Sequence, residues 1–549
     1  MTHDEAFLHD VIHHHEDDGP RLIYADWLDD HGQPERAEFI RAQIALTRLA
    51  PDDPRRPDLL EREADLLAEH GDRWRAPLLA LGATSAEFRR GFVEEVRLDV
   101  APSAARLLGI FRAAPVRKIT LWSADTDSVA RLARMPEAGR LNRLTLRPAR
   151  GRDRIGPAGA AALAGSPHLA GLTSLFIGGD RVGAEGVRAL AFSSTLRSLT
   201  ELTLHCNDLR DESAFILAES PLLPRLRTLG LGWNDLGDAG VGALLASPSC
   251  AGLRRLDLEL NAFSGLAVAG TIASASHLRL SELNLGHCRL GAEGASILAA
   301  APHLGSLEEL VLQSCGLGDG GMRALAGSPH LAGLRELWLC HNGVTPAGIA
   351  GLGEATFWPR LERLSLNDES IGDAGVEALA DSPALVSLSL WYANVGPEGA
   401  RALARKSFPR LKELSLDSLR LGDEGLACLL SGPGLSGLRC LSLDKTGLTA
   451  AGAAALAESA GLARLHELTL TDEPVGDEGA RHLAESPHAG GLRRLCLNGC
   501  GVGADGAAAL AESPHLGRLL ELTLYRNGIT PDGAGRALRE RFGDRVLFS

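Results

Sequence analysis

Residues 465–491 read LHELTLTDEPVGDEGARHLAESPHAGG, and close variants of this stretch fill most of the 549-residue chain. Each copy has the form LxxLxL, then a Gly-rich turn, a run of small residues and usually Ser-Pro. Fourteen copies occur, and eleven of the thirteen intervals between their starts are 27 residues long. Such a fixed period predicts a solenoid in which each repeat packs only against its neighbours. The repeats start at Leu172, Leu199, Leu226, Leu253, Leu280, Leu307, Leu334, Leu361, Leu385, Leu411, Leu438, Leu465, Leu492 and Leu519.

Each repeat is expected to contain one strand and one helix. The LxxLxL motif places two leucines at alternate positions, which is typical of a short strand with one buried face. The following stretch, such as 476–486, is acidic in its first turn and ends at Ser-Pro, which predicts a helix. Parallel strands stack about 4.8 Å apart and helices about 8 to 10 Å apart. We therefore expect an α/β horseshoe with an inner parallel sheet and outer helices.

Glycine recurs at one position of the expected helices. Glycine inside a helix costs about 0.5 to 1 kcal/mol relative to alanine, so its recurrence predicts that neighbouring helix backbones come close together. A phosphate-binding loop is disfavoured, because no Lys and Ser/Thr follow these glycines in the required pattern. The recurring residues are Gly186, Gly240, Gly294, Gly321, Gly375, Gly399, Gly425, Gly452, Gly479 and Gly506.

The ninth position of each repeat favours Asn or Cys. A polar side chain there can hydrogen-bond the backbone where the strand turns away, forming a ladder from repeat to repeat. This interpretation accounts for three of the nine cysteines, whose spacing favours neither disulfides nor a zinc site. The predicted ladder residues are Asn207, Asn234, Asn261, Cys288, Cys315, Asn342, Cys500 and Asn527, with Thr446 at the same position.

These features resemble the ribonuclease-inhibitor-like class of leucine-rich repeats. The resemblance implies one full helix per repeat and a concave face that binds proteins. We expect the regular solenoid to span residues 172–532. Degenerate first repeats starting at Val93, Val116 and Leu141 would form an N-terminal cap over 93–171. Residues 533–549, with an apolar end at 546–548, would form a C-terminal cap.

Residues 1–92 are predicted to form a separate helical domain. Its expected helices lie in 4–12, 20–32, 34–49 and 57–71, and Gly32 and Gly71 are expected to follow the ends of two of them. The stretch 19–44, GPRLIYADWLDDHGQPERAEFIRAQI, resembles the bacterial repeat-companion domain, a family without an established activity. The region holds 11 Arg and 20 Asp plus Glu, so it carries −9 of the chain's net charge of −14. This charge disfavours nucleic acid as a partner.

Two clusters in this N-terminal region have alternative interpretations. Leu22, Ile23, Trp27 and Leu28 recur at helical spacing, which predicts a buried core, whereas Tyr24, Asp26 and Trp27 could form a docking patch. His9 and His13 are four residues apart and could hold a metal ion, but a solvated helix end explains them more simply.

The concave face is the predicted binding surface. Strand alternation places positions 3, 5, 7 and 8 of each repeat there. Position 3 is acidic in seven repeats and basic in three, which favours a partner with a basic surface. Six of the ten Trp and Tyr residues of the chain also fall on this face, and such residues often anchor protein interfaces. They are Trp122, Trp233, Trp338, Trp391, Tyr392 and Tyr525.

One region of this face combines several signals. The two short intervals, 24 and 26 residues, flank Trp391 and Tyr392. We predict that the main patch lies between residues 334 and 417 and that the three missing residues change the local curvature. The predicted partner-binding residues are Trp233, Trp338, His341, Asp368, Trp391, Tyr392, Asp417, Asp444 and Tyr525.

These features predict a non-enzymatic scaffold that captures a protein on its concave face. The alternative is an adaptor, or an inhibitor or sensor subunit, for a modifying or conflict-system enzyme, with the N-terminal domain docking a second protein. No GxSxG or HExxH motif is present, and no catalytic residue, metal or cofactor is predicted. The acidic N-terminus differs from a signal peptide and no long apolar run occurs, so a cytoplasmic location without membrane contact is expected.

Overall fold

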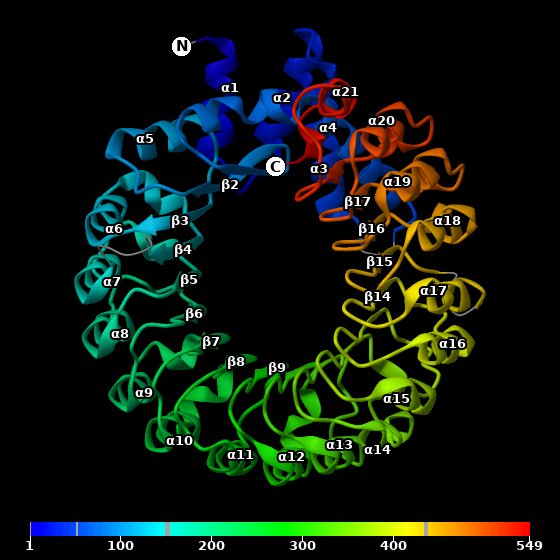
Figure 1. Ribbon diagram of the computed structural model, residues 1–549. Helices are drawn as coiled ribbons and strands as arrows, with labels where there is room; N and C mark the ends of the chain where they lie inside the picture. The colour runs from blue at the N-terminus through cyan, green and yellow to red at the C-terminus, as the bar shows by residue number, and fades with distance from the viewer. Residues whose placement is uncertain (1, 51–52, 149–153, 433–436, 549) are drawn as a thin grey trace. The chain divides into compact units, whose positions relative to one another are not determined.

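A computed structural model describes residues 2–50, 53–148, 154–432 and 437–548 of the chain (Figure 1). The chain divides into an N-terminal unit, Met1–Ala262, and a C-terminal unit, Phe263–Ser549. In each unit a parallel sheet lies on the inner side of an arc and helices lie on its outer side (Figure 1). The fold is therefore a leucine-rich repeat α/β solenoid preceded by helices, as the sequence predicts.

The chain begins with four helices, α1 His3–His13, α2 Gly19–Asp30, α3 Pro34–Arg48 and α4 Arg56–Ala80. The expected end of the last helix at Gly71 is wrong, since α4 continues for nine residues beyond it. Gly71 is buried under the side chain of Arg75, and a Cβ at Gly71 would lie 2.7 Å from Arg75 Nη1. Arg75 also donates to the carbonyl of Ala86. The glycine serves side-chain packing and does not terminate the helix.

The core of these helices contains Val11, Tyr24, Leu28 and Ile40, with Trp27 packed against it. The buried interpretation of Trp27 is thus confirmed in part. Ile23, by contrast, is 56% exposed, so its expected place in the core is wrong. Tyr24 occupies the buried side of α2 instead, and its hydroxyl donates to Asp4.

The helices are attached to the first strands of the sheet. Strand β1, Ser85–Arg89, pairs antiparallel with β2, Phe92–Leu98. The fully buried Arg21 of α2 donates to Glu94 of β2 at 2.7 Å and to the carbonyl of Arg90 at 3.1 Å. Arg117 donates to Glu16 from the following repeat. One buried ion pair, Arg21–Glu94, and one exposed pair, Arg117–Glu16, therefore join the helical region to the start of the sheet.

The remaining strands of the N-terminal unit are parallel, and the leucine at position 4 of each repeat lies beside its equivalent in the next. Its further strands are β3 Lys118–Ala124, β4 Arg143–Pro148, β5 Ser174–Ile177, β6 Glu201–Thr203, β7 Thr228–Gly230 and β8 Arg255–Asp257. Its further helices are α5 Ala104–Ala113, α6 Thr126–Ala133, α7 Gly156–Ala164, α8 Gly183–Ala191, α9 Asp211–Ala218 and α10 Asp238–Ala246.

The C-terminal unit continues the same pattern and ends with β19, which pairs with β18. Its strands are β9 Glu282–Asn284, β10 Glu309–Val311, β11 Glu336–Trp338, β12 Arg363–Ser365, β13 Ser387–Ser389, β14 Glu413–Ser415, β15 Cys440–Ser442, β16 Glu467–Thr469, β17 Arg494–Cys496, β18 Glu521–Thr523 and β19 Val546–Leu547. Its helices are α11 Gly265–Ser274, α12 Gly291–Ala299, α13 Gly318–Ala326, α14 Pro346–Ile349, α15 Gly372–Ala378, α16 Pro397–Arg405, α17 Gly422–Leu430, α18 Ala450–Glu458, α19 Gly476–Glu485, α20 Ala504–Glu512 and α21 Ala534–Phe542.

Most of the recurring glycines lie where adjacent helices meet, whereas Gly294 and Gly375 lie closest to the residue before their own helix. A Cβ at Gly240 of α10 would lie 2.7 Å from the Cα of Asp211 at the start of α9. A Cβ at Gly506 of α20 would lie 3.0 Å from the Cα of Asp477 in α19. The predicted close approach of the helix backbones is confirmed at these positions. Asp211 and Asp477 in turn accept hydrogen bonds from the backbone that begins the next helix, at Gly237 and Gly503.

In the described part of the chain, no helix combines the length and the apolar character needed to cross a membrane.

Candidate functional site

The ninth position of the repeats carries a hydrogen-bonded ladder in the structure. Asn207 is fully buried, and its Oδ1 accepts from the backbone N–H groups of Asp180 and Val182 in the preceding repeat. Its amide nitrogen donates to the carbonyls of Ile177 and His205. Asn234 and Asn342 make equivalent bonds, so one side chain joins two consecutive turns.

The thiols at this position donate to backbone carbonyls and are much weaker acceptors than an amide oxygen. Cys315 Sγ donates to the carbonyl of Leu285 at 3.0 Å, and Cys500 Sγ donates to Leu470 at 2.7 Å. Cys288 Sγ lies 3.4 Å from the carbonyl of Gly286. Burial raises the pKa of Cys500 to about 12, which keeps this thiol protonated and unreactive.

Three carboxylates occupy ladder positions that the sequence analysis missed. Asp180, Glu369 and Glu473 are almost completely buried at position 9 of their repeats. Glu369 accepts from the backbone of Asn342 at 2.5 Å and of Val344 at 2.6 Å. Burial raises the pKa of Asp180 and of Glu369 to about 7, although backbone hydrogen bonds oppose the shift. The signal was present in the register, but acidic residues resemble solvated turn residues when only Asn and Cys are sought.

Position 8 lies in a turn and does not belong to the strand. In all fourteen repeats the residue there has a positive φ, including Trp233 at 59°, His341 at 58°, Asp368 at 57° and Tyr392 at 56°. Strand alternation was therefore the wrong argument for this position, because each strand has already ended. The left-handed turn directs these four side chains into solvent, where they are exposed.

The aromatic residues predicted on the concave face differ in exposure. Trp122, Trp233, Trp391, Tyr392 and Tyr525 are 39–49% exposed, whereas Trp338 on β11 is half-buried. Trp233 belongs to the N-terminal unit, and Tyr525 lies in the last repeat. The structure therefore does not gather all six into one patch.

Trp391 and Tyr392 form the most prominent exposed pair. Their rings lie 5.1 Å apart between centroids in the turn after β13. Trp391 Nε1 donates to Ser418 Oγ in the next repeat at 3.2 Å. The Trp391 N–H donates to Asn367 Oδ1 at 2.9 Å. Both ends of Trp391 are thus fixed by neighbouring repeats while nearly half of its surface faces solvent.

Other predicted residues of this region are bonded to the same turn. His341 Nδ1 lies 2.8 Å from Asp368 Oδ2. The Asp368 N–H donates to the carbonyl of Trp391 at 2.6 Å, and the Tyr392 N–H donates to the carbonyl of Asp417 at 3.1 Å. The structure therefore brings His341, Asp368, Trp391, Tyr392 and Asp417 together along four consecutive turns. We call these five residues the aromatic patch.

Asp417 and Asp444 also accept hydrogen bonds from the backbone of the next repeat. Asp417 Oδ1 accepts from the Asp444 N–H at 3.0 Å, and Asp444 Oδ1 accepts from the Thr471 N–H at 2.7 Å. Ser415 and Ser442 donate to Asp417 as well. Burial, together with the nearby charge of Asp417, raises the pKa of Asp444. These carboxylates are less available to a partner than freely solvated ones.

Several acidic residues at position 3 are paired with arginines across the sheet. Glu336 lies 3.6 Å from Arg363, and Glu467 forms an ion pair with Arg494. The net negative charge of the concave face is therefore smaller than the count of carboxylates indicates. Each such Glu–Arg pair forms only where an acidic and a basic position 3 lie on neighbouring strands.

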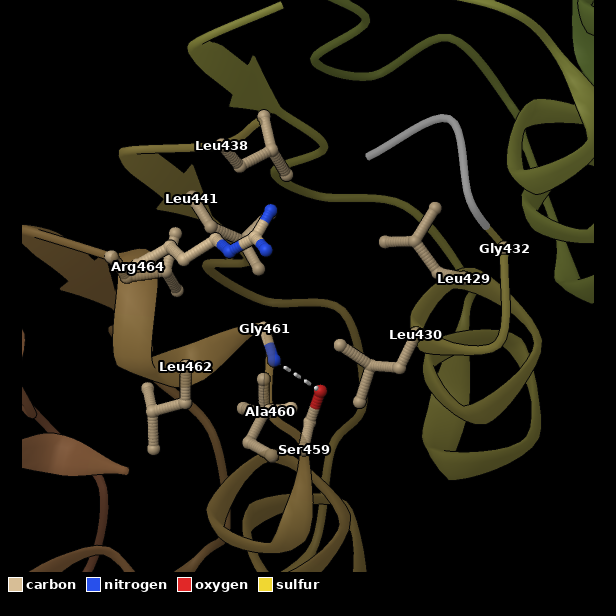
Figure 2. A pocket seen from close by; sticks show the side chains of 12 residues that line it. Leu429, Leu430, Gly432, Leu438, Leu441, Ser459, Ala460, Gly461, Leu462 and Arg464 are labelled. Carbon is tan, nitrogen blue, oxygen red and sulfur yellow. Dashed lines mark hydrogen bonds between the residues drawn. The ribbon is translucent and has the colours of Figure 1, made fainter. Parts of the chain in front are cut away.

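Among the described residues, neither the His9–His13 pair nor the apolar pocket beside α17 shows such an arrangement of bonded side chains. His13 Nδ1 bonds to the carbonyl of His9, and among the described residues no group of three or more His, Cys, Asp or Glu side chains could hold a metal ion. An apolar pocket between α17 and the start of the next repeat is lined mainly by leucines, with Ser459 and Arg464 (Figure 2). Gly432, at its lining, directly precedes four residues outside the described part. The described lining of this pocket offers no set of converging polar groups for chemistry.

A comparison with protein-family models agrees with the repeat assignment. A family model described as Leucine Rich repeat matches residues 224–245, 280–299 and 303–326. A search of curated proteins finds no match. A solved internalin from Listeria monocytogenes is 16% identical, with 70% of this chain and 88% of that chain covered and a TM-score of 0.34. A chain of the yeast Rad7 and Elc1 complex is 15% identical, with coverages of 91% and 98% and a TM-score of 0.40. The repeat motif, the strand–helix architecture and the matched family model together identify the chain as a leucine-rich repeat protein.

Proposed function

We propose that this chain is a non-enzymatic scaffold that captures a protein with a basic surface on the concave face of its C-terminal unit. Leucine-rich repeat proteins are typically protein-binding scaffolds, and solenoids present extended concave surfaces for this purpose. The observation that carries the proposal is the exposed Trp391–Tyr392 pair, with rings 5.1 Å apart and exposed fractions of 45% and 48%.

The pair has the properties of an interface anchor. Large aromatic side chains that the core does not need can each contribute about 2 kcal/mol or more to binding when a partner covers them. Trp391 is already oriented by Ser418 and Asn367, so little conformational entropy would be lost on binding. The four leucines of the repeat core nearest to it, by contrast, are fully or almost fully buried: Leu364, Leu366, Leu388 and Leu390.

The charge around the pair supports a basic partner. Asp368 and Asp417 lie on either side of the aromatic rings, and the Asp368 carboxylate is exposed beside His341. Glu413 lies on β14, next to the strand that leads to Trp391. A Lys or Arg of the partner would meet Asp368 and Glu413 at the edge of the contact and would be oriented by them. Asp417 would contribute less, because it already accepts from Ser415 and Ser442. The half-buried Trp338, together with Asp444, would extend the same surface; Trp233 and Tyr525 are proposed as separate contacts.

The N-terminal region is proposed to cap the array. We assign residues 1–92 to a repeat-companion-like domain and 93–171 to degenerate first repeats of the ribonuclease-inhibitor-like class. The buried Arg21–Glu94 pair supports a fixed position for this domain, since it joins α2 to β2. At the other end, residues 533–549 are proposed as a C-terminal cap, because Val546 pairs with Leu522 of the last regular strand.

The test uses the full chain and a partner isolated with it from the native cell extract. The double variant Trp391→Ala/Tyr392→Ala is compared with Phe215→Ala, which removes an exposed aromatic side chain from the outer helix α9. Titration calorimetry with the purified partner is expected to show at least a 30-fold weaker Kd for the double variant, corresponding to about 2 kcal/mol. Phe215→Ala should leave the Kd unchanged. Equal affinity of the double variant and the wild type would contradict the proposal.

A further inference from the structure

A row of stacked side chains crosses the concave face of the N-terminal unit. Arg97 of β2 lies over the ring of Trp122 of β3, with its Cζ 4.5 Å from the ring centroid. Arg147 of β4 lies 4.8 Å from the centroid of the same ring and 4.9 Å from that of Phe176 on β5. The Phe176 ring in turn meets His205, after β6, edge to face at 5.8 Å. We call these five residues the arginine–aromatic row.

Two glycines allow these side chains to lie along the sheet. A Cβ at Gly178 would lie 2.7 Å from Phe176 Cε1, so a side chain at Gly178 would displace the ring from Arg147. A Cβ at Gly230 would lie 2.9 Å from His205 Nε2. His205 crosses over Gly230 and reaches Asp257 two strands away, at 3.0 Å. The row therefore depends on small residues at concave positions that larger side chains could otherwise occupy.

Arg147 is the distinctive member of the row. Arg97 Nε donates to Asp99 at 2.8 Å, so part of its hydrogen-bonding capacity is used. Arg147 is exposed, and within the described residues its recorded contacts are the two aromatic rings. A guanidinium has five N–H donors, all in its plane. With its Cζ 4.8 Å and 4.9 Å from the two ring centroids, Arg147 is restrained between Trp122 and Phe176. Because neither contact is a hydrogen bond, its in-plane N–H groups can still donate to an anion.

The surroundings of the row are cationic although the whole chain carries −14. Lys118 and Arg143 lie beside it at position 3 of β3 and β4. Both also line a recess of about 350 Å³ that contains five cationic side chains and two carboxylates. Lys118 is paired with Glu95 at 2.8 Å, whereas the Arg143 guanidinium lies 3.9 Å from the Glu201 carboxylate. The recess lining thus has more cations than carboxylates, opposite in sign to the aromatic patch, although Arg89, Arg90 and Arg117 are themselves ion-paired.

The geometry favours carboxylates over nucleic-acid bases. Single-stranded nucleic acids bind by stacking bases on open aromatic faces. Arg97 and Arg147 come from the strands on either side of β3 and both lie over the Trp122 ring, so a base would have to displace an arginine in order to stack there. A planar, oriented guanidinium instead matches the two oxygens of a carboxylate.

We propose that the arginine–aromatic row binds an acidic peptide segment of another protein. The carboxylates of this segment accept hydrogen bonds from the in-plane N–H groups of Arg147. Lys118 and Arg143 would attract flanking acidic residues. This surface lies in a different unit from the aromatic patch and has the opposite charge, so the inference is independent of the proposed function.

The experiment measures binding of a fluorescent eight-residue glutamate peptide to the full chain by anisotropy at low salt. Arg147→Gln is expected to weaken binding at least tenfold. Arg188→Gln removes the same charge from the outer helix α8 and should change the affinity less than twofold. Arg147→Lys retains the charge without the planar donor edge and should recover less than half of the loss in binding free energy.

A second variant tests the orientation without changing charge. Gly178→Ala should displace the Phe176 ring and weaken glutamate-peptide binding several-fold. Trp391→Ala/Tyr392→Ala should leave it unaffected, which separates this inference from the proposed function. The inference is overturned if the wild type does not bind the glutamate peptide better than its glutamine counterpart, if Arg188→Gln and Arg147→Gln weaken binding equally, or if an eight-nucleotide single-stranded DNA binds more tightly than the peptide.

Discussion

A single position in each repeat determines how its turn is joined to the next one. At position 9, the Asn207 amide satisfies two backbone donors and two carbonyls, whereas the Cys315 thiol donates to the carbonyls of Leu285 and Gln313. Leaving such buried backbone groups without partners costs about 1 to 3 kcal/mol each. Glu369 solves the same problem with a carboxylate, at the cost of burying a titratable group.

This acidic ladder residue should make stability depend on pH. Since burial raises the pKa of Glu369 to about 7, the folded state holds a proton there more tightly than the unfolded state. Stability from this group is therefore complete below the normal glutamate pKa and is lost as the pH rises through 7. Glu369→Asn restores a common ladder residue. Its free energy of unfolding, relative to that of the wild type, should increase by about 2 to 3 kcal/mol when the pH is raised from 5 to 8.

Urea denaturation at several pH values measures this difference in the free energy of unfolding. The exposed Glu377→Gln on α15 is the control and should show no such trend. A pH-independent difference between Glu369→Asn and the wild type would show that the carboxylate is ionised throughout this range.

At the residue scale, sequence predicts what depends on register alone. The Asn and Cys ladder residues can be found by counting from each LxxLxL motif. Counting also reaches Glu369, but the sequence does not show that this carboxylate is buried and serves the ladder. The bonds of Asp417 to Ser442 and Asp444 do not follow from register at all. Those depend on burial and on partners about 27 residues away, and acidic residues occur equally well in solvated turns.

At the scale of elements, the outer helices are packed so closely that a single added methyl group can affect stability. In α10, a Cβ at Gly240 would meet the backbone of Asp211, whereas a Cβ at Gly242, two residues later, would have no neighbour within 4 Å. The two glycines share the same helix but face different surroundings. They therefore provide a matched pair for testing helix spacing.

Alanine substitutions at these glycines should have opposite effects. Gly240→Ala should lower the free energy of unfolding by about 1 to 3 kcal/mol, because α9 must move away. Gly242→Ala should raise it by about 0.5 to 1 kcal/mol, since alanine favours the helix. Thermal and urea unfolding of both variants provides the comparison, and stabilisation by both would rule out close packing as the reason for Gly240.

Sequence was less informative about where elements end. The strand and helix of each repeat were predictable because the pattern occurs fourteen times, which separates periodic features from chance. The end of α4 was not predictable. Glycine often marks a helix end, but Gly71 lies within α4, under the side chain of Arg75. Nothing in the local sequence reveals that Arg75 will bond to β1.

At the scale of the whole molecule, charge and aromatic residues are distributed between two surfaces of different character. The C-terminal unit presents Trp391 and Tyr392 beside Asp368, and the N-terminal unit presents Arg147 between Trp122 and Phe176. Net charge and position counts predicted an acidic concave face. They could not predict the arginine–aromatic row, because its members occupy two different register positions and meet only where Gly178 leaves space.

The central claim is that the turns around Trp391 and Tyr392 contact the protein partner directly. A photo-reactive phenylalanine analogue in place of the exposed Asn394 would lie two residues beyond this pair and leave both rings intact. The same analogue in place of Phe215, on the outer helix α9, is the control. On illumination of the complex, we predict cross-links to the partner from position 394 and none from position 215. Cross-links from position 215 alone would contradict this account.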